Sequence, residues 1–122
     1  MNNQDIWLAY PALIELSRLI QSGDTAQVIA RNIKALQSHY YEIEHSRREL
    51  ARKYGIRKPG DAFNCPEYIV ESSKILSGES DVEIEPFEIP DKVIYVYAGG
   101  RQVEVPFLCK PGDLAPLTEH IV

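Results

Sequence analysis

The most regular spacing of hydrophobic residues lies between positions 24 and 55. Apolar side chains recur there in steps of four and three residues, which is typical of a helix that packs a narrow stripe against a neighbouring helix. We call this stripe the seam. It consists of Ile29, Ile33, Leu36, Tyr40, Ile43, Arg47, Leu50 and Tyr54, of which Arg47 alone is charged. The pattern predicts one long helix over 24–55 whose seam needs a partner along its whole length.

Capping signals mark both ends of this long helix. Asp24, with Gln27 three residues later, fits a capping box at its start. Gly55, followed by the apolar Ile56, fits a Schellman motif at its end. Within the seam, we expect Arg47 either to set the register of the helix or to pair with an acidic residue.

A shorter helical pattern precedes the long helix. Pro11 favours a first turn, so either the helix begins near Tyr10 or a short helical turn at 5–9 precedes a kink. Of these, we expect a main helix over 11–21, with Trp7 and Tyr10 packed beside it as a flap. The short link at Gly23 folds the two helices into an antiparallel hairpin. The first helix can cover only the first half of the seam. The second half needs cover from the rest of the chain or from a second copy.

A third helix is predicted at about 65–77, after a loop over 56–64. Asn64 can cap this helix, Pro66 suits its first turn and Gly78 ends it. Beyond Gly78 the hydrophobic period changes to that of strands, because apolar and acidic residues alternate.

The C-terminal part predicts a β-hairpin and a last short helix. Residues 93–97 and 103–107 are β-rich, and the Ala-Gly-Gly-Arg turn between them joins them. Asp113 can cap the last helix. We therefore expect an α+β fold in one domain, 1–122, with a small antiparallel β-sheet packed near the second half of the long helix. Its parts are the helical hairpin (1–55), the loop and third helix (56–78) and the β-rich part (79–122).

Composition indicates an ordinary globular domain. The chain has 122 residues, of which 44% are hydrophobic and 25% charged. No apolar run approaches the roughly 20 residues of a membrane span, and no signal-peptide pattern opens the chain. We therefore expect a cytoplasmic protein with no membrane contact. Its two cysteines, Cys65 and Cys109, are then reduced and packed as small apolar side chains.

Charge is distributed unevenly along the chain. The formal net charge of −5 argues against a protein that coats nucleic acid. Most of the basic residues precede position 59, and most of the acids follow it. We expect the basic run at the end of the long helix to pair with the acids of 79–91, within the chain or between subunits. A charged protein partner and a nucleic-acid backbone are the alternatives.

Tyrosine and arginine together are typical of binding surfaces, and equally of a small α+β core with wet rims. The candidate binding residues are Arg47, Arg48, Arg52, Lys53, Tyr54, Arg57, Lys58, Tyr95 and Tyr97.

No catalytic or cofactor motif is present in the sequence: neither G-x-G-x-x-G, a Walker loop, H-E-x-x-H nor C-x-x-C occurs. Glu42 and His45 have the spacing of one carboxylate-bridged di-iron pair, but such a site needs two pairs and two further glutamates. A solvated helix face explains the pair more simply. We expect no catalytic residue, no metal and no cofactor.

Part of the chain resembles small proteins encoded by tailed bacteriophages and prophages, a group without an assigned function. The similar parts are a first short helix over 13–20, the long helix QVIARNIKALQSHYYEIEHSRRELARKYG, an acidic segment and the ending GDLAPLTEHIV. They cover about half of the chain. The resemblance implies a phage accessory protein in the host cytoplasm. It would be an inhibitor or adaptor that acts on a host protein, counter-defence included, or a small assembly factor.

The leading hypothesis is a non-enzymatic protein-interaction module that binds a host protein. It would self-associate through Ile43, Arg47, Leu50 and Tyr54, which the first helix leaves uncovered. The alternative is a protein that binds a small ligand or a nucleotide in a groove lined by tyrosine and arginine, between sheet and helix. A phage assembly factor or a nucleic-acid-associated protein is the third hypothesis.

Overall fold

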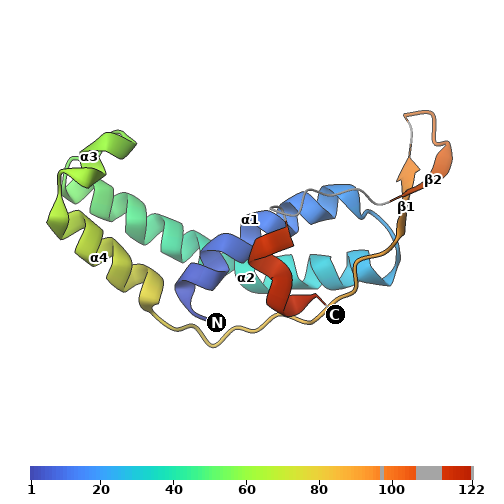
Figure 1. The fold of residues 1–122 in the computed structure, drawn as a ribbon, viewed down its shortest axis with the longest axis horizontal. Helices are drawn as coiled ribbons and strands as arrows, with labels where there is room; N and C mark the ends of the chain where they lie inside the picture. Colours follow the sequence, from blue (N-terminus) through green and yellow to red (C-terminus); the bar gives the residue numbers. More distant parts are fainter. Residues whose placement is uncertain (97, 107–113, 122) are drawn as a thin grey trace.

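The computed structural model describes residues 1–96, 98–106 and 114–121, with the backbone alone described for 93–96, 103–106 and 119. The long helix α2 (Gly23–Lys53) is the spine of the molecule. Two shorter helices, α1 (Asn3–Leu19) and α4 (Pro66–Ser77), lie end to end along it, and both run antiparallel to it (Figure 1). Their 17 and 12 residues together nearly match the 31 residues of α2. The seam is therefore covered along its whole length.

The two ends of α2 differ in how well the sequence predicts them. At the C-terminus, Ile56 N–H donates to the Ala51 carbonyl at 2.8 Å and Gly55 N–H to the Arg52 carbonyl at 3.2 Å, with Gly55 at φ +67°. This is the Schellman pattern, so that prediction is confirmed. At the N-terminus the predicted cap is wrong. Ser22 takes the N-cap position without a side-chain hydrogen bond, and Asp24 lies inside the first turn. Gly23, at φ +87°, makes the sharp turn between the two helices.

Helix α1 begins eight residues before the predicted start at 11. Asn2 is its N-cap, and the Asn2 side chain accepts a hydrogen bond from Asp5 N–H at 2.8 Å. Pro11 lies inside the helix, so one backbone hydrogen bond is missing there. Ile6 and Ala9 are nevertheless fully buried before it. Burial of this first part against the core outweighs the local penalty of the proline.

Hydrogen bonds close the junction between the end of α4 and the start of α1. Asn3 donates from its backbone to the Gly78 carbonyl at 2.8 Å and from its side chain to the Ile75 carbonyl at 2.9 Å. The Ser80 hydroxyl donates to the Asn3 side-chain oxygen at 2.8 Å. The negative end of the α4 dipole thus meets the positive end of the α1 dipole, an arrangement that stabilises both termini.

The segment between α2 and α4 is more ordered than a loop. A one-turn helix, α3 (Pro59–Phe63), occupies the predicted turn. The Asp61 carboxylate accepts the backbone N–H groups of Arg57 and Lys58 at 3.0 and 3.3 Å. Asn64 ends α3 instead of capping the next helix, so Cys65 precedes α4.

Residues 79–91, which we call the strap, return along α1 and the first half of α2 (Figure 1). Val82, Ile84 and Phe87 are buried, while the acids between them are exposed, so the predicted alternation holds. The strap attaches through Asn32, which is 1% exposed. The Asn32 amide donates to the Glu85 carbonyl at 2.9 Å, and its oxygen accepts Glu85 N–H at 2.8 Å.

The predicted α+β class is wrong, because the fold is mostly helical. Two short strands, β1 (Lys92–Val96) and β2 (Gln102–Pro106), pair antiparallel with Tyr95 opposite Val103. They form no layer on the second half of α2, because α4 occupies that place and the hairpin projects from the opposite end (Figure 1). The described core residues come from the helices, the strap and the short 3-10 helix η1 (Ala115–His120), whose Leu117 is fully buried. The predicted cap of the last helix, Asp113, lies outside the described residues.

Candidate interaction surface

Three residues of the predicted basic run form ion pairs within the chain. Arg48 pairs with Glu44 at 2.6 Å, Arg52 with Glu49 at 2.7 Å and Lys53 with Glu71 at 3.7 Å. None of these acids belongs to the strap, so the predicted pairing with residues 79–91 does not form within the chain at this end of the molecule. The described strap pair is Arg31 with Glu85, at 2.7 Å in the first half of α2. Its hydrogen bond lowers the pKa of the Glu85 carboxyl.

Arg47 stacks on an aromatic ring. Its guanidinium carbon lies 4.8 Å from the centre of the Trp7 ring. Trp7 stacks on Tyr40 at 5.1 Å, and Tyr40 stacks on Tyr10 at 4.4 Å, with Tyr41 edge-on beside them. We call Arg47, Trp7, Tyr40 and Tyr10 the stacked ladder. The ladder joins α1 to α2, so Arg47 fills its seam position through a cation–π contact rather than an ion pair with an acid.

Tyr54 ends the seam beside α4. Burial, and then the hydrogen bond and charge of Glu71, raise the pKa of the Tyr54 phenol. An open groove of about 350 Å³ lies here between the end of α2 and α4. Its lining residues are Tyr54, Pro66, Glu67, Val70, Glu71 and Lys74. Two carboxylates in this lining make it a poor match for the phosphates of a nucleotide.

The remaining predicted binding residues do not complete a single site. Arg57 and Lys58 are exposed next to α3, with no side-chain ion pair among the described residues. Tyr95 lies in β1, where the backbone alone is described, and Tyr97 lies outside the described residues. The backbone of β1 stands at the opposite end of the molecule from the C-terminus of α2 (Figure 1). The expected groove between sheet and basic helix end is therefore not assembled.

The surface expected for self-association is covered within the chain. Ile43 and Leu50 are 5% and 9% exposed, because α4 packs over them. Tyr54 and Arg47 are half-buried, Arg47 against Trp7. A dimer through these four residues would require α4 to leave.

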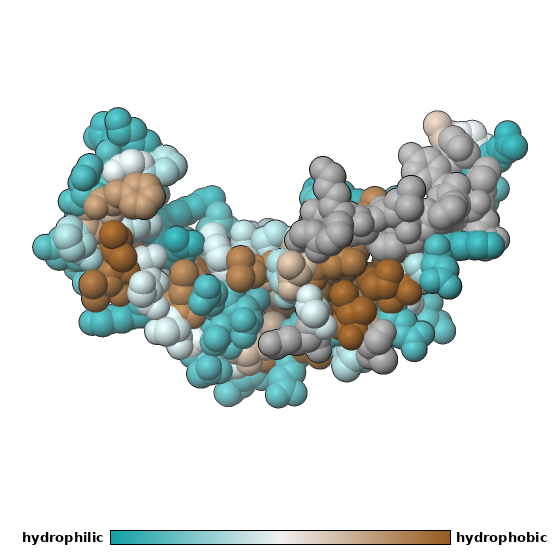
Figure 2. Space-filling view, viewed as in Figure 1, coloured by the Kyte–Doolittle hydropathy of each residue, from teal (hydrophilic) through white to brown (hydrophobic). Residues whose placement is uncertain are grey.

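Exposed hydrophobic side chains gather on α3 and α4 instead. Phe63 is 82% exposed, Val70 53% and Ile69 45%. Figure 2 shows hydrophobic surface at the end of the molecule that these helices form. None of these three residues is among the binding residues predicted from the sequence. The sequence does contain a sign of this surface: the apolar residues of 65–77 fall on two sides of one helix, and only one side can pack against α2. Ile75 and Leu76 pack against the core and Tyr68 is half-buried, while Ile69 and Val70 are exposed.

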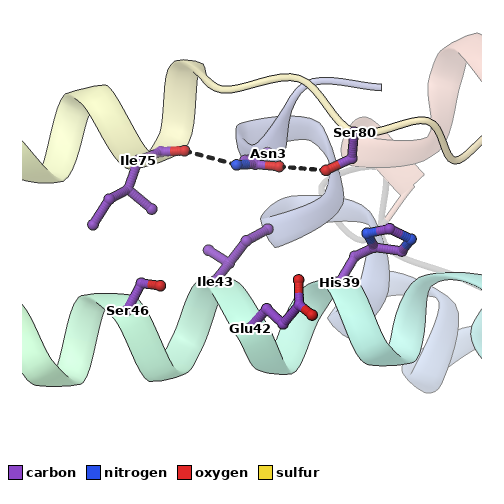
Figure 3. A pocket seen from close by; sticks show the side chains of 7 residues that line it. All are labelled: Asn3, His39, Glu42, Ile43, Ser46, Ile75 and Ser80. Carbon is purple, nitrogen blue, oxygen red and sulfur yellow. Dashed lines mark hydrogen bonds between the residues drawn. The ribbon is translucent and has the colours of Figure 1, made fainter.

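A small polar pocket of about 130 Å³ lies where α1, α2 and α4 meet (Figure 3). His39, Glu42 and Ser46 from α2 face Asn3 and Ser80 across it. The Asn3 and Ser80 side chains hydrogen-bond to each other, so they hold the junction together. Within residues whose placement is described, no three His, Cys, Asp or Glu side chains lie close enough to hold a metal ion.

Comparison with known proteins found no match among protein-family models, curated proteins or solved structures. The resemblance to phage proteins therefore stays a prediction. None of the described helices combines the length and apolar character that a bilayer crossing requires.

Proposed function

We propose that this chain is a protein-interaction module, which works by binding rather than by catalysis, and that the α3–α4 end is its binding surface. The exposure of Phe63, Ile69 and Val70 supports this proposal. Contiguous exposed apolar side chains with a polar rim are typical of protein contact sites. Charged residues lie close to the apolar ones, since Glu67 and Lys74 line the same groove as Val70 and the exposed Arg57 and Lys58 directly precede α3.

Site-specific photo-crosslinking tests the proposal. A benzoylphenylalanine placed at Val70, in the cells that naturally express the protein, should give discrete adducts after irradiation. The matched control carries the same group at Leu19, which is 44% exposed at the far end of α1. Adducts from position 70 and none from position 19 would support the proposal. Absence of any adduct from position 70 would refute it.

The mass of an adduct separates the kinds of partner. An adduct of twice the chain's mass identifies a second copy, and any other mass identifies a different protein. An inhibitor or adaptor of a host protein would give the second result, and an assembly factor would cross-link to a structural protein. Phage origin and a cytoplasmic location belong to the proposal and rest on the sequence alone.

A further inference from the structure

The outer side of α4 carries a regular stripe of exposed residues. They follow one another in steps of four, three and four, the spacing of a helix that packs lengthwise against another helix. We call them the outer stripe: Pro66, Val70, Ser73 and Ser77. Glu67 and Lys74 border one edge of this stripe. The exposed Ile69 borders the other edge, together with the half-buried Leu76, which also packs against the core. One edge is thus charged and the other is apolar.

This arrangement is complementary to itself when two copies run antiparallel. In an antiparallel pair with twofold symmetry, each edge meets the same edge of the other helix. Glu67 then faces Lys74 of the second copy and Lys74 faces its Glu67, while the apolar edges meet on the other side. In a parallel pair the charged edge would face the apolar edge, so the charges would lose water without gaining partners. Edge charges of this kind set the orientation of paired helices.

Charged residues beyond the two ends of α4 also favour an antiparallel pair. Arg57 and Lys58 precede the helix, whereas Glu79 and Asp81 follow it. These four side chains form no ion pair with one another or elsewhere in the described part of the chain. Within one chain they are separated by α4, whose 12 residues span about 18 Å. In an antiparallel pair, the basic end of each copy lies over the acidic end of the other.

We propose that the protein forms an antiparallel homodimer through the outer stripe of α4, with two reciprocal Glu67–Lys74 ion pairs between the copies. The inference rests on the proposed use of the α3–α4 end as a binding surface, and it names a second copy as the partner. A contact along one helix of 12 residues is a small interface, and small interfaces are weak. Dimer formation should therefore depend on protein concentration.

Sedimentation velocity on the full chain, between about 10 µM and 1 mM, tests the pairing. The weight-average mass should rise from 13.8 kDa towards twice that value. Lys74→Glu and Glu67→Lys should each weaken association at least tenfold, because each sets like charges together at both ion pairs. The double variant should restore association to within about threefold, since it exchanges the two charges. The matched control, Lys34→Glu, changes an exposed lysine in the first half of α2 and should leave association unchanged.

Two results would overturn the inference. One is a mass of 13.8 kDa at every concentration. The other is association that the double variant fails to restore while its circular dichroism matches that of the wild type. In either case, adducts from position 70 to a different protein would leave the proposed function standing, and absence of all adducts would remove both.

Discussion

Replacement of Asn32 by leucine should detach the strap from α2. The Asn32 side chain has the same branching and the same number of non-hydrogen atoms as leucine, and it makes two hydrogen bonds to the backbone of Glu85. Leucine fills the space but leaves the Glu85 N–H and carbonyl without partners. Since Val82, Ile84 and Phe87 depend on the same segment for their burial, we expect loosening across the strap.

The loss of unfolding free energy in Asn32→Leu can be estimated from the two hydrogen bonds that the variant lacks. Each is expected to contribute about 1 kcal/mol net, and each backbone group left unpaired in a buried place costs about 1–3 kcal/mol. Water can reach part of the strap, because Glu85 itself is exposed, so the lower part of the range applies. We therefore expect Asn32→Leu to lower the free energy of unfolding by about 2–4 kcal/mol. That is a large fraction of the 5–15 kcal/mol typical of a domain.

Urea denaturation followed by circular dichroism gives the comparison. The control is Glu85→Gln, which removes the exposed ion pair with Arg31 but keeps both backbone bonds. It should change the midpoint little, because exposed ion pairs contribute weakly. Equal losses in the two variants would refute the reasoning, since the strap would then be held by charge and not by its backbone.

The variant Asn32→Asp tests the same contact with the Glu85 backbone through the pH dependence of stability. The introduced carboxyl would be buried and one of its oxygens would face the Glu85 carbonyl, and both effects favour its protonated form. They oppose the Glu85 N–H, which donates to the other oxygen, and we expect them to raise the pKa of the carboxyl above its unfolded value. A raised folded pKa gives stability that is present below the unfolded pKa, about 4, and is lost as pH rises through the folded pKa. Relative to Asn32→Leu, the Asn32→Asp variant should therefore become less stable from pH 4 upward. A constant difference between the two variants would contradict this geometry.

Three further predictions concern single contacts. Gly55→Ala should destabilise by about 1 kcal/mol in urea denaturation, because φ is +67° while no atom lies within 4 Å of an added Cβ; a neutral result would mean that the Schellman turn is not required. Arg47→Ala should lower the free energy of unfolding by about 0.5–2 kcal/mol and change the fluorescence of Trp7, the single tryptophan, whereas Arg48→Ala should leave that emission unchanged. The raised pKa of Tyr54 contributes stability that is present below pH 10 and lost as pH rises through the folded pKa. Tyr54→Phe should therefore flatten the alkaline decline of the urea midpoint, and an unchanged decline would contradict that contribution.

The sequence predicts best where the responsible contacts are local. Gly55 and Ile56 act within one turn of α2, so their pattern could be recognised without knowledge of the fold. Pro11 shows the opposite case. Its local preference is for a first turn, but Ile6 and Ala9 bury completely before it and extend the helix. The gain from that burial depends on α2 and η1, which local patterns do not place.

The α+β prediction is wrong for a related reason. The alternation in the strap is that of a strand with one buried face, yet the strap joins no sheet. Its central backbone groups are satisfied by the side chain of Asn32, and Phe87 N–H donates to the His120 carbonyl at 3.0 Å. A period of two therefore reports alternating burial, which a single extended segment can also provide when side chains supply its hydrogen bonds.

The proposed binding surface lies on the outer side of α4, the helix that covers the second half of α2. The seam predicts correctly that the second half of α2 needs a partner, and Ile43 and Leu50 are buried by α4. Helix α4 is apolar on two sides, however, and its inner side alone is used. Helix α4 thus buries the apolar residues of α2 and leaves apolar residues of its own exposed. A more polar outer side of α4 would have covered α2 equally well, so the exposed Ile69 and Val70 are the observation on which the proposed binding surface rests.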